Sequence, residues 1–215
     1  MKIGILFSGR GSNMSALIEA CSDANFPAEI VVAISNNPDA GGLAIAQKAG
    51  IPTHVINHRE YENRETFDAA LDAALKTAGV ELVCNAGFMR ILTNGFVESW
   101  KNRQLNIHPS LLPAFKGLHV HERVLTAGAR ITGATVHFVR AEMDEGPIVA
   151  QAAVAVQPDD TVETLSARVL AAEHKLYPMA LRLVAEGKAR VQGERVALQA
   201  AGHTETGPLF VPPLA

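Results

Sequence analysis

The chain has 215 residues, of which 48% are hydrophobic and 19% carry a formal charge. This composition is typical of a globular protein, and the length is sufficient for one domain with a substantial core. The formal net charge of -3 gives no sign of non-specific binding to nucleic acid, and no apolar run reaches the ~18 residues needed to span a membrane.

Two features of the sequence favour the cytoplasm as the compartment. Cys21 and Cys84 lie far apart and form no CxxC pair, so neither a disulfide framework nor a zinc site is expected. The segment from Met1 to Phe7 is too short for a signal peptide and predicts a buried first strand instead. We expect residues 1–200 to form the domain and residues 201–215, rich in Gly, Pro and Thr, to form a loose tail.

A glycine-rich turn, Ser-Gly-Arg-Gly-Ser-Asn over residues 8–13, follows the strand predicted for Lys2 to Phe7 and precedes helical spacing. Backbone N–H groups at a helix start favour anions, so we expect a single phosphate to bind at Gly11, Ser12 and Asn13. Met14 stands where a dinucleotide fingerprint needs its third glycine, and no GK[ST] follows. The alternative is that Ser12 or Asn13 merely caps the helix.

Strands and helices alternate along the rest of the chain. Apolar runs predict strands over residues 29–35, 53–56, 81–86, 104–107, 131–139 and 148–156. Amphipathic spacing predicts helices over residues 43–49, 64–78, 94–100, 120–127 and 161–185, and residues 190–198 predict a small hairpin. The alternation predicts a single α/β domain with a doubly wound, mostly parallel, Rossmann-like sheet and helices on both of its faces.

The stretch Gly-Phe-Met-Arg-Ile-Leu over residues 87–92 follows a predicted strand. It should therefore lie at the edge of the sheet where ligands bind in open α/β folds. Its apolar residues could line a pocket for a flat heteroaromatic ligand. The alternative is ordinary core packing by three of them: Met89, Ile91 and Leu92.

Asn106 and His108 are two residues apart at the end of a predicted strand, so both side chains should lie on one face. Pro109 has no N–H to donate and ends the pairing there. An amide and an imidazole on one face can both donate to an oxygen that becomes negative during a reaction. The alternative is a strand end with two surface polar residues.

Further histidines are harder to interpret. His119 and His121 have the i, i+2 spacing of a metal pair, but no third ligand is evident nearby, and a hydrogen-bonding role is favoured. The sequence gives no role for His137.

Four stretches together resemble one family, the folate-dependent formyltransferases. They are Gly-Arg-Gly-Ser-Asn at 9–13, Gly-Phe-Met-Arg-Ile-Leu at 87–92, Asn-Ile-His-Pro-Ser-Leu-Leu-Pro at 106–113 and Met-Asp-Glu-Gly-Pro at 143–147. Each motif alone is weak to moderate, whereas the set in this order is specific. The single-phosphate loop favours the family members that formylate 5-phosphoribosylglycinamide in purine biosynthesis.

The resemblance implies an acyl transfer from 10-formyltetrahydrofolate, a co-substrate, with no metal and no covalent enzyme intermediate. It implies three catalytic residues, with Asp144 pairing to His108 and favouring its charged form: Asn106, His108 and Asp144. The ribonucleotide would be bound by four residues: Gly11, Ser12, Asn13 and Glu173. The folate would be bound by six, with Arg64 at its glutamate tail: Arg64, Met89, Arg90, Ile91, Leu92 and Asn106.

Three alternatives are weighed against this function. Methionyl-tRNA formyltransferase shares a similar His-Pro-Ser-Leu-Leu-Pro stretch but carries a C-terminal domain for which this chain is too short. Formyltetrahydrofolate hydrolase carries an N-terminal regulatory domain, whereas the catalytic fold is expected here from residue 1. A nucleotide-binding protein without catalysis would explain the turn at residues 8–13, but not the catalytic trio. We expect small molecules as partners, no nucleic acid and no membrane, and a monomer or homodimer.

Overall fold

The computed structural model describes residues 1–199 and residue 211. Seven strands form one sheet in the order β3-β2-β1-β4-β5-β6-β7. They are β1 (Lys2–Phe7), β2 (Glu29–Ser35), β3 (Thr53–Val55), β4 (Leu82–Asn85), β5 (Gln104–His108), β6 (Ile131–Phe138) and β7 (Ile148–Ala155). The first five strands are parallel, whereas β6 pairs antiparallel with both β5 and β7, so the predicted doubly wound, mostly parallel sheet is confirmed.

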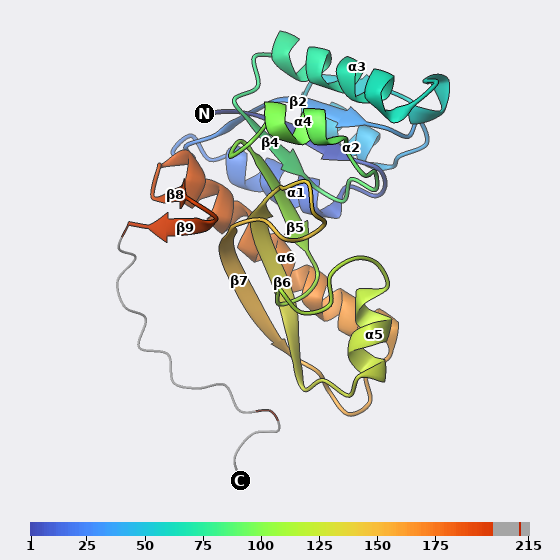
Figure 1. The fold of residues 1–215 in the computed structure, drawn as a ribbon, viewed down its shortest axis with the longest axis vertical. Helices are drawn as coiled ribbons and strands as arrows, with labels where there is room; N and C mark the ends of the chain where they lie inside the picture. The colour runs from blue at the N-terminus through green and yellow to red at the C-terminus, as the bar shows by residue number, and fades with distance from the viewer. Residues whose placement is uncertain (200–210, 212–215) are drawn as a thin grey trace.

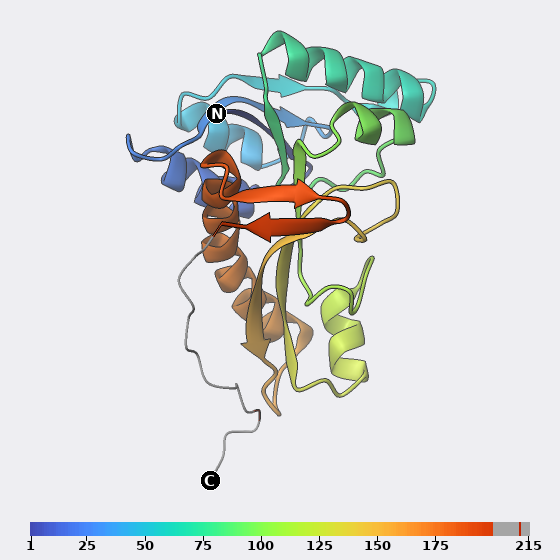
Figure 2. The ribbon, with the colours of Figure 1, turned by 60° about the vertical axis from the view of Figure 1, so that its left-hand side comes forward.

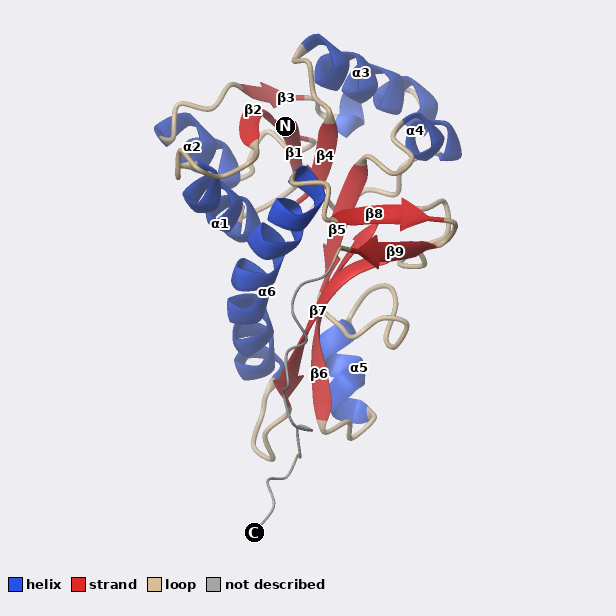
Figure 3. Ribbon diagram, turned by 90° about the vertical axis from the view of Figure 1, so that its left-hand side faces the viewer, coloured by secondary structure: helices blue, strands red, loops and turns tan. Residues whose placement is uncertain are grey.

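Helices cover both faces of this sheet, as Figure 3 shows. They are α1 (Ser12–Cys21), α2 (Gly42–Lys48), α3 (Arg64–Thr77), α4 (Asn94–Ser99), α5 (Val120–Thr126) and α6 (Val162–Ala185), with a 3-10 turn at His58–Glu60. Successive side chains along β1 point to opposite faces of the sheet, so this strand contributes to a core on each face. One set joins a core with α1 and α6: Ile3, Ile5, Phe7, Met14, Leu17 and Tyr177. Leu6 joins the other core with α3 and α4: Phe67, Leu71, Phe96 and Trp100.

Local signals explain where several elements begin and end. Thr161 caps α6 with a capping box, and Asn63 caps α3 in the same way. Helix α1 begins at Ser12 after Gly11, whose φ of 77° is left-handed, and no side chain caps it. The interpretation that Ser12 or Asn13 caps this helix is therefore wrong, because both lie inside its first turn.

The predicted hairpin is confirmed as β8 (Ala189–Gln192) and β9 (Arg195–Leu198). Figure 2 shows its turn beside the loop between β6 and β7, and the Arg140 guanidinium donates to the Glu194 carboxylate at 2.9 Å. The tail predicted for residues 201–215 lies, apart from residue 211, outside the described residues. Among the described helices, none combines the length and the apolar character required to cross a membrane.

The arrangement of β1, β4 and β5 determines where a site can form. Since these strands are parallel neighbours, their carboxyl ends meet at one edge of the sheet. The strand order reverses direction between β1 and β4, and ligands in open α/β sheets bind in the crevice beside such a reversal. Figure 1 shows the longer strands β6 and β7 continuing past this edge, with α5 beside them.

Candidate active site

A cavity of about 710 Å³ opens at the carboxyl ends of β4 and β5. Most of its lining comes from the loop of residues 87–92, from residues 106–109 and 117–122, and from the loop between β6 and β7; Asn13 of α1 and Glu173 of α6 also line it. The loops after β1 and β4 are joined beside it, because Ser8 N–H donates to Gly87 O at 3.0 Å and Met89 N–H donates to Ser8 Oγ at 2.7 Å. These bonds fix the wall that the 87–92 loop provides.

Asn106, His108 and Asp144 all line this cavity. The two residues from β5 point to the same face, as their spacing predicted. Asp144 comes from the loop between β6 and β7, and its Oδ2 lies 3.3 Å from His108 Nδ1. His108 Nε2 lies 3.0 Å from the carbonyl oxygen of Phe115. Because both ring nitrogens face oxygen acceptors, an imidazolium can donate at both positions.

His137 lies opposite Asn106 in the antiparallel pairing of β5 and β6. Its Nδ1 faces the carbonyl oxygen of Phe138 at 3.0 Å, which can only accept, so Nδ1 carries the proton. Burial lowers the pKa of His137, an effect that the Asp144 carboxylate, 3.7 Å from Nε2, offsets in part. Burial thus favours the neutral ring, in which Nε2 accepts from the Asn106 amide at 3.2 Å. This contact fixes the orientation of the amide and leaves its second N–H for the cavity. Sequence reasoning missed this role, and only the cross-strand register could have indicated it.

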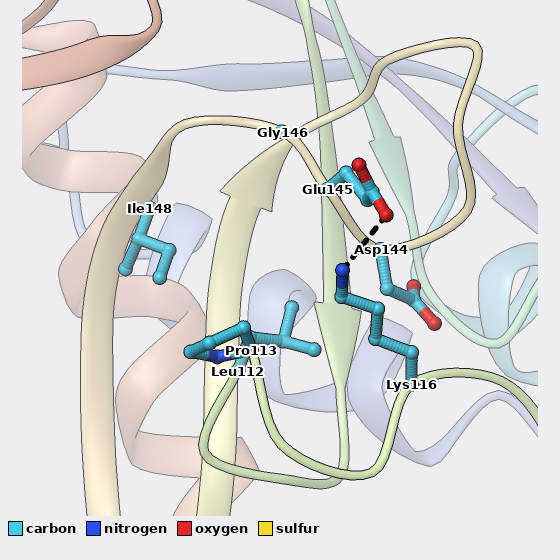
Figure 4. A pocket seen from close by; sticks show the side chains of 7 residues that line it. All are labelled: Leu112, Pro113, Lys116, Asp144, Glu145, Gly146 and Ile148. Atoms are coloured by element: carbon cyan, nitrogen blue, oxygen red, sulfur yellow. Dashed lines mark hydrogen bonds and ion pairs between the residues drawn. The ribbon is translucent and has the colours of Figure 1, made fainter.

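The backbone around Asp144 is unusual, with a φ of 57°. Its carboxylate accepts a 2.9 Å bond from the Gly117 N–H, so the loop after β5 helps to hold it. Next to it, Lys116 and Glu145 form an ion pair of 2.8 Å between the two loops, shown as a dashed line in Figure 4. These residues, with Leu112, Pro113, Gly146 and Ile148, line a second, smaller pocket of about 140 Å³ that Asp144 also borders.

Glu173 reaches the cavity from α6 and is buried. Its carboxylate accepts a 2.7 Å bond from the Asn13 amide at the start of α1. Burial raises the pKa of Glu173, and the bond from Asn13 offsets part of this effect. The Oδ1 atom of Asn13 is buried and has no hydrogen-bond partner among the described residues. Gly11 and Ser12 lie at the same helix start but do not line the cavity.

The 87–92 loop forms an apolar lip. Met89 is 68% exposed and Ile91 is 61% exposed, so the core-packing alternative is wrong for these two side chains, whereas Leu92 is half-buried against the core. All three line the cavity together with Arg90, whose guanidinium lies 5.7 Å from the centre of the Phe67 ring. Arg64, at the first residue of α3, is exposed and is not among the lining residues.

His119 and His121 both line the cavity but differ in their surroundings. His119 is exposed and lies 3.8 Å from Glu122, whereas the Nδ1 atom of His121 is buried. Burial, and to a lesser extent the charge of His108, lowers the pKa of His121. In the part of the chain that the structure describes, no cluster of three or more His, Cys, Asp or Glu side chains could hold a metal ion.

Ser110 and Thr135 belong to a buried network that shapes the loop after β5. Ser110 Oγ donates to the carbonyl oxygen of Ala114 at 2.6 Å, and Thr135 Oγ1 donates to that of Ser110 at 2.7 Å. Ser110 is fully buried. Phe115 and Gly117 act through backbone atoms, and no side-chain pattern could have predicted these contacts.

Residues 1–181 match the family model described as formyl transferase. The chain is 40% identical over 191 residues to phosphoribosylglycinamide formyltransferase of Escherichia coli (strain K12), a match that covers 89% of this chain and 90% of that enzyme. It is 53% identical over 190 residues to the trifunctional purine biosynthetic protein adenosine-3 of Bos taurus, but spans only 19% of that protein. A crystal structure of glycinamide ribonucleotide transformylase 1 from Symbiobacterium toebii is 46% identical, has a TM-score of 0.91 and is matched over 94% of its chain and 93% of this one.

Proposed function

Since this chain belongs to the formyl transferase family, we propose that it transfers the formyl group of 10-formyltetrahydrofolate to the amine of 5-phosphoribosylglycinamide. The products are formylglycinamide ribonucleotide and tetrahydrofolate, and the reaction is a step of de novo purine biosynthesis. One observation carries the proposal: a single cavity holds Asn106, His108 and Asp144 together with the buried pair of Asn13 and Glu173.

The chemistry proposed for this site is direct acyl transfer. The amine nitrogen attacks the formyl carbon, and a tetrahedral intermediate with a negative oxygen forms. The second N–H of Asn106 and an N–H of His108 donate to that oxygen. The bond between the formyl carbon and N10 of the folate then breaks, and the proton lost by the amine passes to N10.

His108 can serve both as an oxyanion donor and in this proton transfer. Its Nε2–H faces a neutral carbonyl oxygen, whereas its Nδ1–H faces the carboxylate of Asp144. A hydrogen bond to a charged partner is the stronger one, so the bond to Asp144 is kept. The Nε2–H group is therefore the one that exchanges its carbonyl partner for the substrate oxygen. Asp144 keeps its contact and stabilises the imidazolium.

We also propose which residues bind the two substrates. The phosphate is proposed to bind at the start of α1, where Gly11, Ser12 and Asn13 present backbone N–H groups along the positive end of the helix dipole. Glu173 would accept from hydroxyl or amine groups of the ribonucleotide. The pterin ring would lie against the apolar lip formed by three residues: Met89, Ile91 and Leu92.

Two arginines are proposed to serve the folate. Arg90 lines the cavity, whereas Arg64 lies outside its lining, so Arg64 would meet only the glutamate tail that extends from the cavity. The cytoplasmic location, the monomeric or homodimeric state, and a partner set limited to small molecules, with neither nucleic acid nor membrane, stay predictions. Light scattering on the purified protein would decide the oligomeric state.

The test mixes the purified protein with 5-phosphoribosylglycinamide and 10-formyltetrahydrofolate. We expect loss of the formyl-folate to depend on the amine and to match the formylglycinamide ribonucleotide found by mass spectrometry. Formyl release without the amine would identify a hydrolase instead. Turnover only with charged initiator tRNA would identify the tRNA enzyme, and nucleotide binding without turnover would contradict an enzymatic function.

A further inference from the structure

The segment of residues 115–119, between β5 and α5, has a strained backbone. Phe115 has a φ of 54°, Gly117 of 80° and His119 of 54°. Residues with a Cβ rarely adopt a positive φ, and both Phe115 and His119 have a Cβ. Such a conformation persists only where surrounding contacts hold it. Something outside the segment must therefore fix it.

This same segment contacts both members of the His–Asp pair through backbone atoms. The Phe115 carbonyl oxygen accepts from His108 Nε2, and the Gly117 N–H donates to Asp144 Oδ2. A shift of the segment would move an acceptor of His108 and a donor to Asp144 at once. The geometry of the pair therefore depends on the conformation of residues 115–117.

Arg123, on α5, contacts the segment on both sides of Gly117. Its Nη1 donates to the carbonyl oxygen of Lys116 and, at 3.3 Å, to that of Leu118. Its guanidinium carbon lies 5.8 Å from the centre of the Phe115 ring, within the range of a cation–π contact. Figure 1 shows α5 immediately after the loop that leaves β5, so Arg123 lies on the helix that directly follows the segment it contacts.

We propose that Arg123 is a positioning residue, which holds residues 115–118 so that His108 and Asp144 keep their catalytic geometry. This inference rests on the proposed function for its kinetic consequences, but the structural part does not need it. The planar, fixed donors of a guanidinium suit two carbonyl oxygens and an aromatic ring together, which an ammonium group cannot match.

The main variant is Arg123→Met, which keeps an unbranched apolar stem and removes the donors. We expect kcat to fall by about 10- to 100-fold, the range for a small misplacement of catalytic groups. The KM values of both substrates should change less than kcat, because Arg123 itself does not line the cavity and reaches it only through Gly117 and Leu118 of the segment that it holds. Arg123→Lys should recover part of the loss, and added guanidinium ion should partly rescue Arg123→Met but not the native protein.

Arg103→Met is the matched control. Arg103 also donates to a backbone carbonyl, that of Ser99 at 2.8 Å, and its guanidinium lies 4.8 Å from the Trp100 ring centre, but it precedes β5 at the opposite end of the strand. This variant removes the same kinds of contact and should leave kcat unchanged. Urea unfolding of both variants shows whether they lose stability equally.

A second readout does not use activity. Ring nitrogen signals of His108 in NMR spectra should change in Arg123→Met and remain native in Arg103→Met. If the native protein had no turnover, the proposed function would fail while this comparison still tested the positioning role. Unchanged His108 signals together with native kcat in Arg123→Met would overturn the inference, as would an equal loss of kcat in both variants.

Discussion

Gly146 is the residue at which the placement of Asp144 can be tested most directly. It lies two residues beyond Asp144, is buried, and packs against the end of β6. A methyl group at Gly146 would overlap the carbonyl oxygen of Phe138 and lie 2.8 Å from its carbonyl carbon. Because carbon atoms in contact are normally ~3.5–4.0 Å apart and the overlap with the oxygen is more severe, Gly146→Ala must displace the loop by at least about 1 Å.

This displacement gives an expected loss of catalytic rate. Asp144 Oδ2 lies 3.3 Å from His108 Nδ1, so a shift of about 1 Å would take the pair beyond the ~4 Å limit of an ion pair. Misplacement of this size can cost about 10²-fold in rate, and we expect Gly146→Ala to lower kcat by about that factor. Steady-state assays with both substrates measure it, and urea unfolding at the same pH measures the accompanying loss of stability.

Two comparisons isolate the cause. Gly95→Ala is the matched control: apart from its chain neighbours and the backbone of its own helix, the nearest atom to its methyl group would be Thr93 Oγ1 at 4.0 Å, and it should retain native kcat. In a chain that already carries Asp144→Asn, Gly146→Ala should add little further loss, because the contact that it disrupts is gone. A full 10²-fold loss in that background, or a native kcat for Gly146→Ala, would refute the reasoning.

Three further predictions concern the cavity. Gly11→Val should raise the KM of the ribonucleotide at least ~10-fold with little change in the folate KM, and equal weakening of both would indicate a folding defect. His108→Ala should lower kcat by at least ~10²-fold with little change in folate affinity, and a variant within a few-fold of native would remove His108 from the mechanism. Burial raises the pKa of Glu173, so the stability this group contributes is full below ~4.3 and is lost as pH rises through the folded-state value. In urea unfolding, Glu173→Gln should therefore gain stability over the native chain as the pH rises above about 4, and parallel curves would contradict this.

The sequence predicted what depends on local periodicity. The alternation of side chains along β5 was sufficient to put Asn106 and His108 on one face, and Pro109 was sufficient to end the strand. Amphipathic spacing gave the helices to within a few residues, because the core selects the same side chains that the spacing marks.

What the sequence could not predict depends on contacts between distant segments. His137 faces Asn106 only because β5 and β6 pair in one particular register. Phe115 and Gly117 act through a carbonyl and an N–H, groups that every residue has, so their identity carries little signal. The exposure of Met89 and Ile91 follows from a loop tied to Ser8, and an apolar sequence alone favours burial.

In the protein without a ligand, buried polar groups of the cavity lack full hydrogen bonding, which costs free energy. The kind of group that could supply the missing hydrogen bonds indicates the kind of ligand. Asn13 Oδ1 is buried without a partner among the described residues, and burial disfavours the charged form of Glu173 beside it. A buried acceptor without a donor costs ~1–3 kcal/mol, and a ligand recovers this free energy only if it brings N–H or O–H groups. A flat, apolar ring system would leave Asn13 Oδ1 unpaired, whereas an amine or a sugar with free hydroxyls could donate to it and to the Glu173 carboxylate. The acceptors of Asn13 and Glu173 therefore favour a ligand with N–H or O–H groups, whereas the apolar lip favours a flat ring. A transfer between a polar ribonucleotide and a folate requires two such different ligands in one cavity.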